Sequence, residues 1–97
     1  MYITNFQHFL DEEGKIPKEI PPEARELANF MALIVDAATS SQDRVGRTGL
    51  KCNSEGCSGD VYFIVNPQES ICWGCVDCPN EGVISGWQNT NWDNRSK

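Results

Sequence analysis

The clearest hydrophobic pattern in the chain lies in residues 22–39. Apolar side chains recur there at intervals of three and four residues, which places them on one face of a helix. This face consists of Leu27, Phe30, Met31, Ile34 and Ala38. Pro22 suits the first turn of a helix, and Glu23 and Glu26 complement the positive end of the helix dipole. We therefore expect an amphipathic helix over residues 22–39, with its apolar face in the protein core rather than in a partner's groove.

The pattern before this helix is weaker. Ile3, Phe6 and Leu10 fit one face of a short helical turn that ends at Gly14. Prolines then follow, and each disfavours helix in the residue before it. We expect an extended linker between the short turn and the main helix.

The second half of the chain has short runs of β-branched and aromatic residues. Residues 61–65 read Val-Tyr-Phe-Ile-Val, and Asn-Pro-Gln-Glu at 66–69 predicts a turn into a second strand at 70–73. Residues 82–87 indicate a third short strand. The predicted fold is small α+β, with an N-terminal amphipathic helix followed by a C-terminal β-hairpin and a third short strand.

Changes in composition divide the 97 residues into four segments. Residues 1–43 form an N-terminal segment with the helix, and residues 44–51 form a basic, glycine-containing connector. The composition changes abruptly at Cys52, so we expect residues 52–93 to be one unit and residues 94–97 a tail. A chain this short buries a modest fraction of its surface, and a metal or disulfide often stabilises such a unit.

Five cysteines supply the candidate chemistry, in the spacing Cys52-x4-Cys57, fourteen residues, then Cys72-x2-Cys75-x2-Cys78. An odd number fits a disulfide framework poorly. No secretory signal or apolar run of bilayer length is visible, so we expect a cytoplasmic protein with no membrane association. Thiols are kept reduced in the cytoplasm, where clustered cysteines are more typical of metal binding.

The predicted hairpin brings two cysteine-bearing loops together, so that four thiolates can surround one zinc ion tetrahedrally at about 2.3 Å. Cys57 lies about ten residues before the predicted turn and Cys75 about eight after it. Cys72 lies only about five residues after the turn, too near it to meet the first loop. The predicted ligands of a single zinc ion are Cys52, Cys57, Cys75 and Cys78. The alternative is that Cys72 and Cys75 form the second pair.

The segment from Cys52 to about Trp87 resembles a zinc ribbon. It differs from the usual ribbon in its four-residue first spacing and in Pro79, where a glycine often follows the second pair. The ending Gly-Trp-Gln-x-Thr-x-Trp-Asp, at residues 86–93, is similar to that of small uncharacterised bacterial proteins that share such a ribbon. This resemblance implies a zinc-ribbon fold and a bacterial source, and it implies no known activity.

Iron is the main alternative metal. The run from Cys72 to Pro79 partly resembles a bacterial iron–sulfur motif, but that motif needs a cysteine where this chain has Gly82. A redox thiol pair is a weaker alternative, because the surrounding strand–helix context is missing. Four thiolates favour a closed structural site, and His8 is expected at the surface. Since no catalytic motif is visible, we expect no enzyme.

The net charge of −6 is unevenly distributed. Between Cys52 and Trp87 the chain has five acidic residues and no lysine or arginine. Nucleic-acid binding needs clustered basic residues, so it is the less favoured function. The sequence favours a monomeric protein-interaction or regulatory adaptor with a structural zinc site, and its expected partner is another protein.

Overall fold

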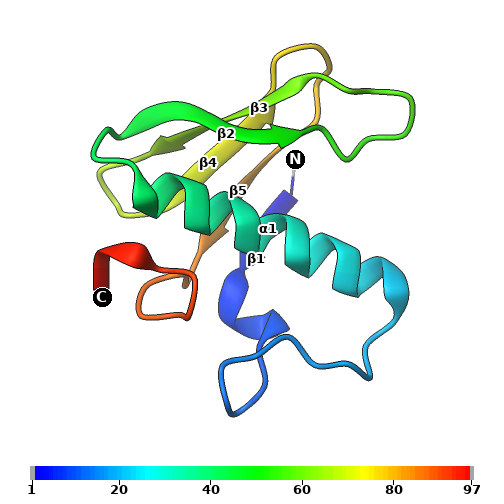
Figure 1. Ribbon diagram of the computed structural model, residues 1–97, viewed down its shortest axis with the longest axis vertical. Coiled ribbons are helices and arrows are strands. Elements are labelled where there is room, and N and C mark those ends of the chain that lie inside the picture. The colour runs from blue at the N-terminus through cyan, green and yellow to red at the C-terminus, as the bar shows by residue number, and fades with distance from the viewer. Residues whose placement is uncertain (1, 97) are drawn as a thin grey trace.

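One α-helix and a five-stranded mixed sheet make up the fold in the computed structural model, which describes residues 2–96 (Figure 1). Two short 3-10 turns, η1 and η2, lie near the chain ends. The elements in chain order are β1 (Tyr2–Asn5), η1 (Phe6–Phe9), α1 (Pro22–Ser40), β2 (Val45–Lys51), β3 (Asp60–Val65), β4 (Ile71–Cys75), β5 (Glu81–Ser85) and η2 (Asn94–Ser96).

The strands lie in the order β1-β5-β4-β3-β2. Strands β2 to β5 form an antiparallel meander, in which each strand pairs with the next one along the chain. Strand β1 pairs with β5 in parallel, from Tyr2 opposite Gly82 to Asn5 opposite Ser85. A parallel pair needs a long connection. Here that connection contains the helix and the rest of the sheet, so the first strand of the chain lies beside the last one.

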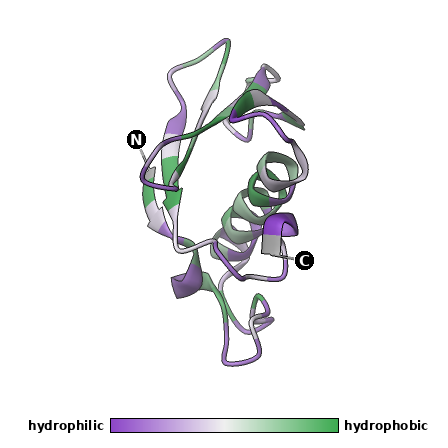
Figure 2. Cartoon of the chain, turned by 90° about the vertical axis from the view of Figure 1, so that its left-hand side faces the viewer, coloured by the Kyte–Doolittle hydropathy of each residue, from purple (hydrophilic) through white to green (hydrophobic). Residues whose placement is uncertain are grey.

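Helix α1 covers one face of the sheet (Figure 2). Its buried side chains are Ala28, Met31, Ala32, Ile34, Val35, Ala38 and Thr39. The Phe30 ring meets the Trp73 ring of β4 edge-on, with 5.3 Å between ring centroids. The predicted apolar stripe is therefore a core face, and the helix extends one residue beyond its predicted end. Within residues 2–96, neither α1 nor any other helix has the length and apolar character of a membrane span.

The predicted fold class was wrong in two respects. The helix lies in the middle of the chain, between β1 and β2, and the sheet has five strands instead of a hairpin with a third strand. Residues 44–51, expected to be a connector, contain β2, whose residues alternate between exposed and half-buried. The sequence of this strand contains no apolar run from which it could have been predicted. Its pairing with β3 and ion pairs from Arg47 and Lys51 to Asp60 hold it in place.

The prediction for the N-terminal segment was correct only in part. A short helical turn is present as η1, but the residues before it, including Ile3, form strand β1. The Asn5 side chain accepts a hydrogen bond from the backbone N–H of Gln7, and this contact begins η1. Phe6 then turns into the core, where its ring packs edge-on against Trp92 with centroids 5.4 Å apart. Trp87 is buried as well. The aromatic residues near the two chain ends thus help to fill one common core.

Candidate metal centre

The four cysteines that the sequence singled out meet at one end of the sheet. Cys52 directly follows β2, and Cys75 is the last residue of β4. Cys57 and Cys78 come from the loops that follow these two strands, which lie at the same end of the sheet (Figure 1). The four Sγ atoms all lie within 4.8 Å of one another.

The shortest distances between sulfurs join one loop to the other. Cys52 Sγ lies 3.6 Å from Cys78 Sγ, and Cys57 Sγ lies 3.6 Å from Cys75 Sγ. A tetrahedron with metal–sulfur bonds of about 2.3 Å has edges of about 3.8 Å, close to these values. A disulfide would need about 2.05 Å. The four groups are free thiols in the arrangement that a tetrahedral ion requires.

Backbone hydrogen bonds shape both loops. In the first loop, Cys52 N–H donates to the Gly59 carbonyl at 2.8 Å and Cys57 N–H donates to Ser54 at 3.1 Å. In the second loop, Cys75 N–H donates to the Asn80 carbonyl at 3.0 Å. These bonds close each loop over its own pair of sulfurs.

A backbone bond also links the second loop to the strand that follows the first. Val76 N–H donates to the Asp60 carbonyl at 3.1 Å. Gly59 is close by, and a Cβ at this position would lie 2.7 Å from both Cys75 Sγ and Asp77 Oδ2. The absence of a side chain at Gly59 thus lets the first loop pass close to the sulfur of the second.

Each loop also directs polar hydrogen atoms at a sulfur. Ser54 N–H points at Cys52 Sγ and Asp77 N–H points at Cys75 Sγ, with N–S distances of 3.4 Å in both cases. The Asn80 side-chain amide approaches Cys52 Sγ at 3.7 Å. Donors of this kind stabilise the thiolate form and orient metal-binding groups.

The pKa values of the two thiols in the first loop, Cys52 and Cys57, are shifted in opposite directions. Burial raises the pKa of Cys52, but hydrogen bonds from Ser54 and Asn80 outweigh this effect and lower the pKa to about 6. The pKa of Cys57 is lowered by the Gly59 backbone, but neighbouring thiols, chiefly Cys75, raise it to about 12. Crowded thiolates repel one another, so one thiolate favours protons on its neighbours. A divalent cation removes this conflict, because it compensates several thiolates at once.

Cys72 lies outside the group of four. It pairs with Ile64 in the middle of the sheet, and it is three residues from Cys75 in a strand whose side chains alternate between faces. Its sulfur therefore lies on the sheet face opposite α1, with the Asn66 side-chain amide 3.8 Å away. The structure therefore does not bring Cys72 and Cys75 together as a second pair of ligands. His8 lies in η1 and is exposed, as the sequence indicated.

Four residues that the sequence analysis missed support the cluster. They are Ser54, Gly59, Asp77 and Asn80. Each lies two residues after one of the four cysteines. That spacing was the signal available in the sequence.

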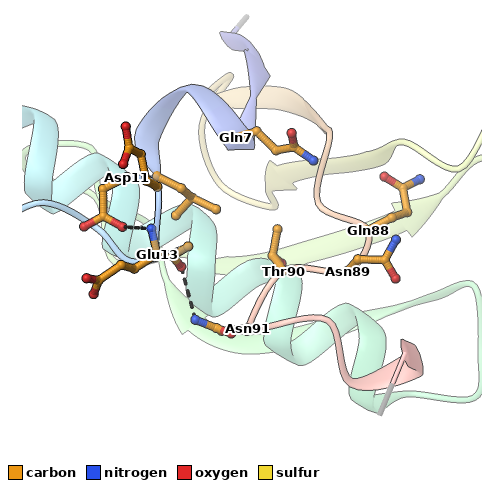
Figure 3. A pocket seen from close by; sticks show the side chains of 10 residues that line it. Gln7, Asp11, Glu13, Gln88, Asn89, Thr90 and Asn91 are labelled. Atoms are coloured by element: carbon orange, nitrogen blue, oxygen red, sulfur yellow. Dashed lines mark hydrogen bonds between the residues drawn. The ribbon is translucent and has the colours of Figure 1, made fainter.

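A polar depression of about 440 Å³ lies at another part of the surface, between residues 10–14 and 88–91 (Figure 3). Asp11 Oδ1 accepts from the backbone N–H groups of Glu13 and Lys15, and the Asn91 amide donates to the Gly14 carbonyl. These side chains stabilise the local turns, and we assign no ligand to the depression.

Comparison of the chain with protein-family models, curated proteins and solved structures finds no match. The structure by itself defines a small α+β protein with four clustered cysteines that could hold a metal ion. This arrangement is compatible with a zinc-ribbon-like site.

The cluster leads to a direct test by substitution. Serine in place of Cys52, Cys57, Cys75 or Cys78 should in each case weaken metal binding by more than the 10- to 100-fold that loss of a supporting contact typically costs. Cys72→Ser is the matched control and should keep the full metal content, measured by elemental analysis of the purified chain. Loss of the metal in Cys72→Ser with retention in Cys78→Ser would show that the wrong four sulfurs have been chosen.

Proposed function

We propose that the protein binds one zinc ion through Cys52, Cys57, Cys75 and Cys78 and that this ion is structural. The observation that carries the proposal is the meeting of four sulfurs from two loops within 4.8 Å. Zinc accepts four thiolates in a tetrahedron without a redox change. Four protein ligands leave no position for water or substrate, so the proposed site stabilises the fold and is not catalytic.

Position explains why a metal matters for this chain. Cys52 and Cys75 are buried in the same hydrophobic cluster as the core residues of α1 and β3. Binding of zinc by such sites contributes on the order of 10 kcal/mol to folding in small zinc-binding peptides. A chain of this size has a limited core, and the ion would connect the loop between β2 and β3 to the loop between β4 and β5.

The proposed role is that of a protein-interaction or regulatory adaptor in the cytoplasm, where the thiols stay reduced until they bind metal. Acidic side chains surround the cluster: Glu55, Asp77 and Glu81 are exposed and form no ion pair among residues 2–96. Four thiolates around a divalent ion add about two further negative charges. A surface of this sign favours a basic protein partner and repels polyanions.

Native mass spectrometry of the purified full chain tests the identity and number of the metal ions. We expect the mass of the chain plus one zinc ion, which a chelator then removes. An iron-containing chain, a second bound ion, or a chain that takes up no zinc when it is supplied in excess would contradict the proposal. Iron would instead support the redox or iron–sulfur alternative.

Nucleic-acid binding is a second candidate, and one observation favours it. Arg47 and Lys51 lie near Tyr62 on the same sheet face, which combines basic and aromatic groups. Both basic residues are already ion-paired with Asp60, whose pKa is lowered mainly by Lys51 and less by Arg47. Asp60 compensates one of these two positive charges, and the one that remains is too little to bind a phosphate backbone tightly.

Duplex DNA and RNA should accordingly bind no more tightly than the non-specific range of roughly 10⁻⁴–10⁻⁶ M at physiological salt. Fluorescence anisotropy with labelled duplexes at low and moderate salt measures this. A sub-micromolar affinity that falls steeply with salt would favour the nucleic-acid function over the adaptor. An Arg47→Ala variant would then show whether the sheet face is responsible.

A further inference from the structure

The sheet face opposite α1 carries an apolar row that crosses all five strands. Register pairs connect its members from edge to edge, in the order Ile3, Val83, Cys72, Ile64, Val45. Within residues 2–96, α1 covers only the other face (Figure 2). The exposed fractions are 82% for Ile3, 61% for Val45 and 40% for Ile64.

These exposures are clustered. The large hydrophobic residues that are exposed in the described chain are Ile3, Leu33, Val45, Ile64 and Val76. Three of these five lie in the row, with half-buried Val83 and Cys72 filling the strands between them. Single exposed apolar residues are ordinary, whereas a continuous exposed row marks an interaction surface.

The charges of the sheet distinguish it from the rest of the molecule. The charged residues within the five strands are Arg47, Lys51, Asp60 and Glu81. Two are basic and two acidic, so the sheet is neutral in a chain with a net charge of −6. If two copies of the chain meet, the net negative charge that makes them repel each other lies outside the sheet.

The arrangement of these charges is self-complementary. Arg47 and Lys51 share the single carboxylate of Asp60, which leaves one positive charge in excess at the β2–β3 edge. Glu81, on β5 near the opposite edge, forms no ion pair among the described residues. A partner that carries the same charges in the reverse strand order would place a carboxylate opposite the excess positive charge and a positive charge opposite Glu81.

We propose that two copies of this chain associate through this face, about a two-fold axis parallel to the strands. Such an axis reverses the strand order, so the β2 edge of one copy faces the β1–β5 edge of the other. The apolar row then packs against the same row read backwards, and the Arg47 region of each copy meets Glu81 of the other. Each contact occurs twice, as in any two-fold interface. Two sheets packed in this way lie about 10 Å apart.

The size of the face predicts a weak dimer. Five strands about 4.8 Å apart and about 17 Å long give a face of roughly 400 Å². Stable interfaces bury about 800 Å² on each partner, so we expect a dissociation constant of about 1 µM or weaker. This association rests on the sheet and does not depend on which metal is bound. Its failure would leave the proposed metal site unaffected.

Analytical ultracentrifugation of the full, metal-loaded chain from about 1 µM to about 1 mM tests the proposal. We expect a reversible monomer–dimer equilibrium in this range. Ile64→Glu places a charge in the middle of the row and should raise the dissociation constant at least tenfold. Leu33→Glu is the matched control, because Leu33 is 49% exposed on the outer side of α1, and it should leave the constant unchanged. Circular dichroism confirms that each variant is folded.

A charge exchange tests the geometry. Glu81→Arg alone brings like charges together in the proposed dimer, and so does Arg47→Glu alone, so each variant should self-associate less than the parent chain. An equimolar mixture of the two should associate again, since every Arg then faces a Glu. A chain that stays monomeric at about 1 mM, an Ile64→Glu variant that dimerises like the parent, or a mixture that does not associate would overturn the proposal.

Discussion

The register between β3 and β4 is the constraint on which the rest of this structure depends. It pairs Val61 with Cys75 and Phe63 with Trp73. Cys75 thereby reaches the end of β4 where the first cysteine loop returns to the sheet, and Trp73 reaches the face that packs against α1. A shift of one residue would move both side chains to the opposite face. The metal site and the core therefore depend on one set of strand hydrogen bonds.

The two sheet faces have different physical roles. One face is continuous with the cysteine cluster, since Cys52 and Cys75 belong to the same buried group as Met31, Phe63 and Trp73. A metal ion bound by these sulfurs would therefore also stabilise the packing of the helix. The other face is neutral and partly apolar, and the helix does not cover it. The structure separates the stabilising part of the sheet from the part available to a partner.

Local patterns predicted the parts of the fold that depend on neighbours in sequence. The helical periodicity located α1, and the alternation of β3 and β4 with their turn located the hairpin. Counting residues from that turn also separated Cys72 from the four sulfurs that the structure brings together. That count was possible because the distances along a hairpin follow directly from strand pairing.

The remaining parts depend on contacts between distant residues. Strand β2 has no buried side chain, so its residues carry no strand signal of their own, and its glycines suggested a connector. One of them, Gly46, lies under the Phe63 ring, where a Cβ would be 3.1 Å from the nearest ring carbon. Strand β1 finds its partner about eighty residues later in the chain, opposite Val83 and its neighbours. Such pairings depend on the assembled core, so they cannot be predicted from a local sequence pattern.

The central claim is that one bound ion holds the sheet and the helix together as a single unit. Chelator titration of the full chain tests this most directly, with metal release and helical circular dichroism followed in the same sample. An isolated helix of this length is marginal in water, so α1 should lose most of its signal in one transition that coincides with metal release. If the helical signal persists after all the metal has been removed, the account is contradicted. This holds whatever the protein concentration.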